Sequence, residues 1–148
     1  MQKVLVSKFV VPGEVVPQAR PRAKVVAGHA RVHDVPKCAE FRNLVRMLAG
    51  ESWTQDMDAD SCFEIDAAFF LPIPKSESQK RQKKMSLWQI LPTRKPDLDN
   101  ALKGVMDGIT GIVWKDDAQV VRCELSKFYG FKPRTAISIF RIIPDTDD

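Results

Sequence analysis

Five charged residues have the types and the spacing that suit a divalent metal ion bound beside a phosphate. Asp97 and Asp99 stand two residues apart just before a helical pattern, Lys103 lies one turn inside it, and Asp116 and Asp117 follow it. Clustered carboxylates repel one another unless a cation resides among them, and Mg²⁺ prefers carboxylate oxygens together with water. Such an ion activates a water and offsets charge on a phosphate. The pattern therefore predicts metal-dependent phosphodiester chemistry.

The helix after the first two acids should fix their positions. Side chains on an extended segment alternate with period two, so Asp97 and Asp99 point to roughly the same side. Free amides at a helix start favour an anionic substrate, and Lys103 can neutralise either the carboxylates or the phosphate. The turn that carries Asp116 and Asp117 can bring one of them back to the first pair.

Each piece also has a purely structural interpretation. The sequence Asp-x-Asp-Asn can cap a helix, Lys103 with Asp107 can form a surface ion pair, and the Asp116-Asp117 pair can be an ordinary turn. Taken separately, each piece is more often structural than catalytic. Together, four or five carboxylates that flank one helix in a net basic protein favour the metal-site interpretation.

Positive charge is concentrated in two segments. The formal net charge is +4 and the pI is about 9.1, which indicates an anionic partner. One basic segment is a proline-containing arm near residues 16–24, which is either a charge-protected strand edge or an arm that contacts phosphates. The other spans 75–95 and is interpreted as a mobile basic flap. The residues predicted to contact DNA are Arg20, Arg22, Lys24, Lys75, Lys80, Arg81, Lys83 and Lys84.

Apolar periodicity predicts a single α+β domain over residues 1–148, with one mixed sheet of about five strands and two main helices. The main helices are expected over 38–48, stopped by Gly50, and over 100–109, ended by Gly111. A short polar helix should run from the Ser76-Glu77-Ser78-Gln79 capping pattern to about residue 88. Strands are expected at 4–11, 25–33 (a strand pair), 62–71, 118–128 and 135–143, the last as the hairpin partner of 118–128.

Two glycines lower the stability of the second main helix. Gly104 and Gly108 each weaken the helix by roughly 1 kcal/mol relative to alanine. We therefore expect another subunit or a strand to approach that face closely.

Cysteine usage and hydropathy indicate the cellular compartment in which the protein is expected. Three cysteines in 148 residues, with no Cys-x-x-Cys pair, argue against a disulfide framework or a structural zinc site. No run approaches the roughly 20 apolar residues that a membrane span requires. A cytoplasmic protein with no membrane partner is expected.

The ordered series of these motifs resembles the RusA family of small Holliday junction resolvases, of the branch encoded by bacteriophages and prophages. The resemblance is carried by an Asp-x-Asp-Asn motif, a lysine, and an Asp-Asp-x-Gln motif in that order. The matching segments are Lys95-Pro96-Asp97-Leu98-Asp99-Asn100, Lys103, Asp107-Gly108-Ile109-Thr110-Gly111 and Trp114-Lys115-Asp116-Asp117-Ala118-Gln119-Val120, with weaker similarity in the arm at 16–22.

The resemblance implies a RusA-like fold and a homodimeric endodeoxyribonuclease that depends on Mg²⁺, with Mn²⁺ as a possible substitute. Such an enzyme resolves four-way junctions by paired symmetric nicks in DNA recombination and repair, in the cytoplasm of a bacterium or a phage-infected host. By motif position, Asp97, Asp99 and Asp117 would bind metal, Asp116 is the adjacent candidate, and Lys103 would be the catalytic lysine.

Two alternatives stay open. In the first, the chain is a non-catalytic recombination accessory protein that binds branched DNA, and its acids only cap and space the helix. In the second, it is a metal-dependent phosphohydrolase of small phosphoesters. The second alternative predicts little loss of substrate affinity when the basic arm and flap are neutralised.

Overall fold

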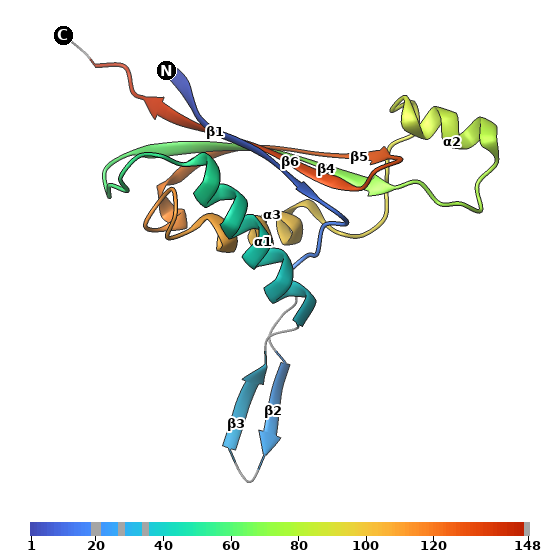
Figure 1. The fold of residues 1–148 in the computed structure, drawn as a ribbon, viewed down its shortest axis with the longest axis horizontal. Helices are drawn as coiled ribbons and strands as arrows, with labels where there is room; N and C mark the ends of the chain where they lie inside the picture. The colour runs from blue at the N-terminus through green and yellow to red at the C-terminus, as the bar shows by residue number, and fades with distance from the viewer. Residues whose placement is uncertain (19–21, 27–28, 34–35, 147–148) are drawn as a thin grey trace.

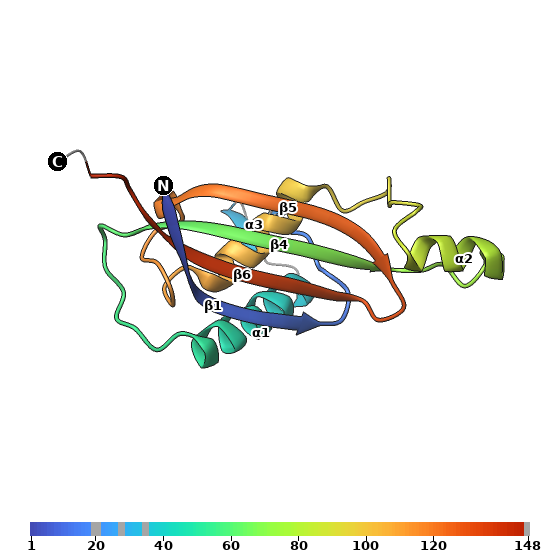
Figure 2. The same cartoon turned by 90° about the horizontal axis from the view of Figure 1, so that it is seen from above.

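Four strands form one mixed sheet, and two helices cover one of its faces (Figures 1 and 2). The computed structural model describes the backbone of residues 1–18, 22–26, 29–33 and 36–146, and the side chains of these residues except 22–26 and 29–33. The strands are β1 (Gln2–Pro12), β2 (Arg22–Val26), β3 (His29–His33), β4 (Cys62–Pro72), β5 (Val120–Gly130) and β6 (Arg134–Ile143). The helices are α1 (Pro36–Ser52), α2 (Gln79–Ser86), α3 (Leu98–Ile109) and the single 3₁₀ turn η1 (Asp117–Gln119).

The order of strands in the sheet is β1-β6-β4-β5. Strands β4 and β5 are parallel, whereas β6 is antiparallel to both β1 and β4. The α+β class and the mixed sheet are confirmed, but the sheet has four strands rather than five, because β2 and β3 pair with each other as a separate hairpin. That hairpin, expected from the sequence, projects away from the sheet beyond the start of α1 (Figure 1).

The predicted hairpin between β5 and β6 is wrong, because β4 lies between them. Strand β4 belongs in the middle because it is buried along most of its length, including Glu64 on the face away from the helices. On its helix-facing side, Phe63, Ile65 and Phe69 form the centre of the hydrophobic core. Residues 131–133 are enough to carry the chain past the end of one strand, since neighbouring strands lie only about 4.8 Å apart.

The two main helices pack against each other under the sheet. Helix α1 continues through Gly50 to Ser52, so the predicted stop at Gly50 is wrong. The close approach expected at the glycines of α3 is present, but its source is this chain's own α1 and the segment before it. A Cβ on Gly108 would lie 2.7 Å from Cγ1 of Val45 and 2.9 Å from the backbone oxygen of Arg42. A Cβ on Gly104 would lie 3.1 Å from the backbone oxygen of Val16.

We expect Gly108→Ala to destabilise the protein by about 1–2 kcal/mol, because overpacking against α1 outweighs the gain in helix propensity. The matched control is Gly50→Ala, since nothing lies within 4 Å of a Cβ built there. That control should stabilise α1 by up to about 1 kcal/mol. Urea unfolding of both variants measures the difference, and equal midpoints would contradict the packing argument.

Helix α2 stands apart at one end of the molecule, as the polar sequence predicts (Figures 1 and 2). Its N-cap is Ser78, whose Oγ accepts a hydrogen bond from the backbone N–H of Arg81 at 3.2 Å. Met85 is buried and anchors the helix, and Trp88, although about half exposed, packs on the ring of Phe128, whereas Leu87 is more than half exposed. None of the helices in the described part of the chain combines the length and the apolar character that crossing a bilayer requires.

Candidate functional site

The carboxylate of Asp97 is held at the start of α3 without serving the helix. Asp97 is the N-cap residue and has extended backbone angles, but its side chain makes no capping hydrogen bond. Instead, Nζ of Lys95 donates to both carboxylate oxygens of Asp97 at 2.9 Å. Asp99 is exposed in the first turn. The capping interpretation therefore does not explain Asp97, whose two oxygens already face a cationic group.

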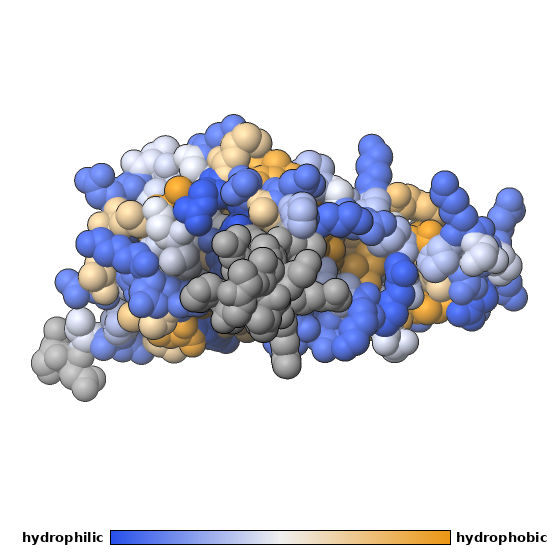
Figure 3. Space-filling model, turned by 90° about the horizontal axis from the view of Figure 1, so that it is seen from below, coloured by the Kyte–Doolittle hydropathy of each residue, from blue (hydrophilic) through white to orange (hydrophobic). Residues whose placement is uncertain are grey.

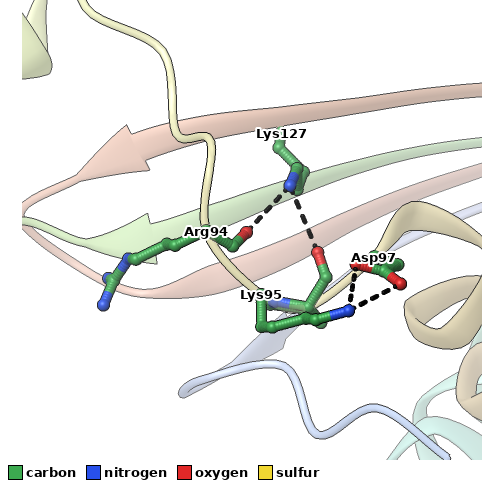
Figure 4. A network of polar contacts seen from close by, with 5 residues as sticks. Arg94, Lys95, Asp97 and Lys127 are labelled. Atoms are coloured by element: carbon green, nitrogen blue, oxygen red, sulfur yellow. Dashed lines mark hydrogen bonds and ion pairs between the residues drawn. The ribbon is translucent and has the colours of Figure 1, made fainter.

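Lys127 fixes the position of the segment that leads to Asp97 (Figure 4). Nζ of Lys127, on β5, donates hydrogen bonds to the backbone oxygens of Arg94 at 2.9 Å and Pro96 at 3.2 Å. The guanidinium of Arg94 lies 5.8 Å from the ring centroid of Tyr129 and donates to the backbone oxygen of Pro72 at 2.8 Å. These contacts hold the entry to α3 against the ends of β4 and β5.

The acidic pair after α3 has two unlike members. Oδ1 of Asp116 accepts a hydrogen bond from the N–H of Ala118 at 2.8 Å, and Asp116 forms a capping box with Gln119. The Ala118 N–H, with a smaller contribution from a hydrogen bond to Asp117, holds the pKa of Asp116 below its usual value. Asp117 is exposed and does not cap η1. Both side chains are exposed, and that of Asp116 is the one held by the backbone of the turn.

The structure does not bring the two acidic segments together within one protomer. Helix α3 has 12 residues and is therefore about 18 Å long, with Asp97 at its start and the 116–117 turn beyond its end. The same separation follows from β5, since Gln119 directly precedes this strand and Lys127, near its other end, contacts Pro96. Among the described residues, no three His, Cys, Asp or Glu side chains form a group able to hold a metal.

Lys103 lies on the exposed face of α3. Its Nζ is 3.7 Å from Oδ1 of Asp107, one turn further along, and its side chain is well exposed. A loose pair of this kind in water contributes little to stability. The surface ion pair considered from the sequence exists, but it leaves the lysine free to move toward an anion.

The predicted DNA contacts fall into two groups. Arg22 and Lys24 lie on β2, and Arg20 lies outside the described residues. The others surround α2 and are exposed, and one of them, Arg81, pairs with Glu77 at 2.8 Å. The exposed residues of this second group are Lys75, Lys80, Arg81, Lys83 and Lys84.

A separate set of charges occupies the face of the sheet that no helix covers. Glu64 is buried. It accepts a hydrogen bond from Nζ of Lys3 at 2.6 Å and forms an ion pair with Nε of Arg122 at 3.0 Å. Burial raises the pKa of Asp66 to about 6, and a hydrogen bond to Glu64 together with the negative charge of Glu64 adds to this increase. The hydrogen bond from Lys3 lowers the pKa of Glu64. Glu64 is thus engaged in an ion-pair network with Lys3 and Arg122.

Lys127 and Arg94 are the residues near the candidate site that sequence reasoning missed. Lys127 falls at a helix-facing position of β5, in register with Phe69 of β4. The sequence offers one signal for Lys127, since it is a cation at a strand position where the alternating pattern predicts an apolar side chain. Arg94 carried no signal beyond its place in a basic segment, because its partners come from distant strands.

Comparison with known proteins supports the motif. A family model described as endodeoxyribonuclease RusA matches residues 12–140. A relative from Bacillus subtilis (strain 168), named uncharacterized protein YqaN, is 36% identical over 134 residues, which cover 89% of this chain and 94% of the relative. The resemblance expected from the sequence is confirmed, and the chain belongs to the RusA endodeoxyribonuclease family.

Proposed function

We propose that this protein is a magnesium-dependent endodeoxyribonuclease that resolves Holliday junctions and related branched DNA by paired symmetric nicks. The observation that carries the proposal is the exposed carboxylate of Asp97. It occupies the N-cap position without capping α3, and both of its oxygens bind the ammonium of Lys95. Together with membership of the RusA family, this argues for a cation site at the start of the helix. The proposal places the enzyme in the cytoplasm, where its DNA substrate is found.

The donor set suits magnesium. Asp97, Asp99 and Asp117 supply oxygens only, as Mg²⁺ prefers, and all three side chains are exposed. When bound, the ion, or Mn²⁺ in its place, supplies an activated water and offsets charge on the phosphate. The free amides at the start of α3 attract the scissile phosphate. Lys103, one turn further, offsets charge on the same phosphate or on the carboxylates.

A homodimer would unite the two acidic segments. A two-fold axis that passes beside α3 near its middle, at right angles to the helix, brings the start of α3 in one protomer to the end of α3 in its partner. Asp97 and Asp99 of one protomer would then face Asp117 of its partner, and Asp116 would be the adjacent alternative ligand. Two such sites related by the axis match the two-fold symmetry of a four-way junction and give two nicks. The proposed dimer therefore follows from the separation of the acids along α3.

The direct test combines binding and cleavage. The purified protein is incubated with a synthetic four-way junction or a linear duplex, with and without Mg²⁺, and any nicks are mapped. We expect symmetric nicks in the junction that require the metal. Junction binding without nicking would instead support the accessory-protein alternative.

The basic residues on α2 are expected to contact phosphates. Each lost phosphate contact should reduce the slope of log affinity against log salt by about 0.9 for duplex arms. The variant Lys83→Gln/Lys84→Gln should therefore reduce the slope for a junction by about 2, as measured by fluorescence anisotropy over a series of salt concentrations.

Lys8→Gln provides the control for this series. Lys8 is exposed on β1, at the opposite edge of the sheet from β5, the strand that α2 contacts, so its removal should leave the slope unchanged. An unchanged slope in the α2 variant would contradict the assignment of these lysines. It would also favour the alternative of a small phosphoester substrate, which needs no extended basic surface.

A further inference from the structure

Three aromatic side chains stack at the end of the sheet beside α2. The ring centroids of Phe70 and Phe128 are 5.5 Å apart, and Trp88 lies 4.6 Å from Phe128 and 6.2 Å from Phe70. The guanidinium of Arg134 lies 3.8 Å from the ring centroid of Phe70. Trp88 is nonetheless 52% exposed, and Phe131, on the link from β5 to β6, is 69% exposed. Two large aromatic surfaces therefore face solvent at the edge of a packed cluster.

These exposed rings border a hollow, which we call the aromatic hollow. Its volume is about 350 Å³, and no acidic residue is among the described residues that line it. Figure 3 shows apolar residues among hydrophilic ones at the right-hand end of the molecule, where Figure 1 places α2. The lining residues are Phe70, Ser86, Trp88, Tyr129, Gly130, Phe131, Lys132 and Arg134.

The backbone of Trp88 has an unusual conformation. Its φ of 61° makes it the one residue other than glycine with a positive φ in the described part of the chain. Bulky side chains rarely adopt this region, which glycine usually fills at a helix end. The N–H of Trp88 donates to the backbone oxygen of Met85 at 3.1 Å and that of Gln89 to the backbone oxygen of Lys84 at 2.9 Å, the pair of hydrogen bonds that closes a Schellman helix end. The end of α2 thus carries a half-exposed tryptophan in the place of the usual glycine, with its ring 4.6 Å from that of Phe128.

The charge around the hollow is positive. Lys132 and Arg134 lie in its wall, and the last turn of α2, which ends at Ser86, carries Lys83 and Lys84. An aromatic platform flanked by cations is the arrangement that binds unpaired nucleotides, because bases stack on the rings while the cations contact phosphates. An apolar protein surface would not require this surplus of positive charge.

The hollow is also joined to the candidate active site. Trp88 begins the connecting segment that ends at Asp97, and Lys127 holds this segment through the backbone oxygens of Arg94 and Pro96. Phe128, the next residue on β5, contacts Trp88. A nucleotide bound in the hollow is therefore held on the same elements that position Asp97.

We propose that the aromatic hollow binds an unpaired nucleobase of branched DNA, stacked on Trp88 and Phe131, with the lysines of α2 on the adjacent phosphates. The inference rests on the proposed function, since it names the feature of the DNA that the nuclease recognises. An opened base pair at the branch point supplies such a base. Perfect duplex does not, because its bases are already stacked.

Tryptophan fluorescence tests this proposal directly. The chain has three tryptophans. Trp114 is fully buried and Trp53 is 9% exposed, so Trp88 is the accessible one. The full-length protein is titrated in EDTA with oligo(dT), a four-way junction or a perfect duplex. We expect oligo(dT) and the junction to quench the emission and to protect it from acrylamide, and the duplex to do neither.

Variants separate stacking from charge. Trp88→Ala should weaken binding of oligo(dT) and of the junction by about tenfold, and Trp88→Phe should keep most of the affinity while losing the fluorescence change. The matched control is Leu91→Ala, an equally exposed apolar residue on the same connecting segment that does not line the hollow. Its affinity should equal that of the wild type. If Trp88→Ala fails to fold, the wild-type titration and Trp88→Phe still decide the question.

Several outcomes would overturn the proposal. A complex visible by gel shift with unchanged Trp88 emission would do so, and so would equal quenching by the duplex. A change in sedimentation of Trp88→Ala with unaltered DNA affinity would show that the hollow is an interface between copies of the chain. Quenching without any nicking in Mg²⁺ would support the base site while refuting the nuclease. Nicking without quenching would refute the base site alone.

Discussion

Asp97→Asn should reduce junction cleavage in Mg²⁺ by about a thousandfold, since losing a metal-binding carboxylate removes about 4 kcal/mol of transition-state stabilisation. The same change should leave junction affinity equal or slightly higher, because it removes a negative charge and releases Lys95 from its pair with Asp97. Helix α3 should remain intact, since the Asp97 side chain makes no capping hydrogen bond. Single-turnover cleavage and gel-shift assays measure the two effects separately.

Asp56→Asn is the control for charge and shape. Asp56 is exposed in the loop between α1 and β4, so the substitution removes the same charge outside the two acidic motifs and should leave the cleavage rate unchanged. Circular dichroism and urea unfolding should show equal stability for both variants. An Asp97→Asn enzyme that cuts at the wild-type rate would refute the assignment of Asp97 to the metal site.

Mixing two inactive variants should restore activity if each site is shared between protomers. In a heterodimer of Asp97→Asn and Asp117→Asn, one site carries both substitutions and the other is intact. Random exchange of subunits makes half of the dimers mixed, so roughly a quarter of the sites should recover. The product should be a junction nicked in one strand, because the mixed dimer has one working site. Denaturing gels with each strand labelled in turn distinguish one nick from two.

The composite arrangement can fail this test in a clear way. Heterodimers are prepared by co-expression with two different tags, so that their formation is verified independently of activity. If purified heterodimers remain inactive, the acids must act within one protomer, which would require a rearrangement of α3 or of the 116–117 turn. Mixing either variant with itself should give no activity at any ratio.

Several features of this protein could be predicted from local sequence. The apolar stripe of α3, the alternation along β4 and the β2–β3 strand pair are patterns over neighbouring residues, and local backbone geometry is enough to interpret them. The family motif is equally local, since its acids and its lysine lie on one helix and the segments beside it. For the same reason, Lys103 and Asp107 were correctly expected on one face of that helix.

Other features were decided only by tertiary packing. Strand β6 pairs with β4 and β1 rather than with β5, because the most deeply buried strand takes the centre of the sheet whatever the length of the link between its neighbours. Gly108 is small because Val45 of α1 occupies the space of its side chain, a contact that no spacing along the chain reveals. Such pairings depend on which surfaces bury one another, and the burial of a surface is a property of the whole fold.

The sequence by itself determined which side chains this protein offers for phosphate chemistry, because residue type and helical spacing are written in the chain. Only the tertiary structure decided how those side chains are distributed in space. A continuous helix is rigid and rises by a fixed length per residue, so α3 separates Asp97, at its start, from the segment that leaves its end and leads to Asp117. Their separation in the folded protomer is the physical reason for placing a second copy of the chain at the site.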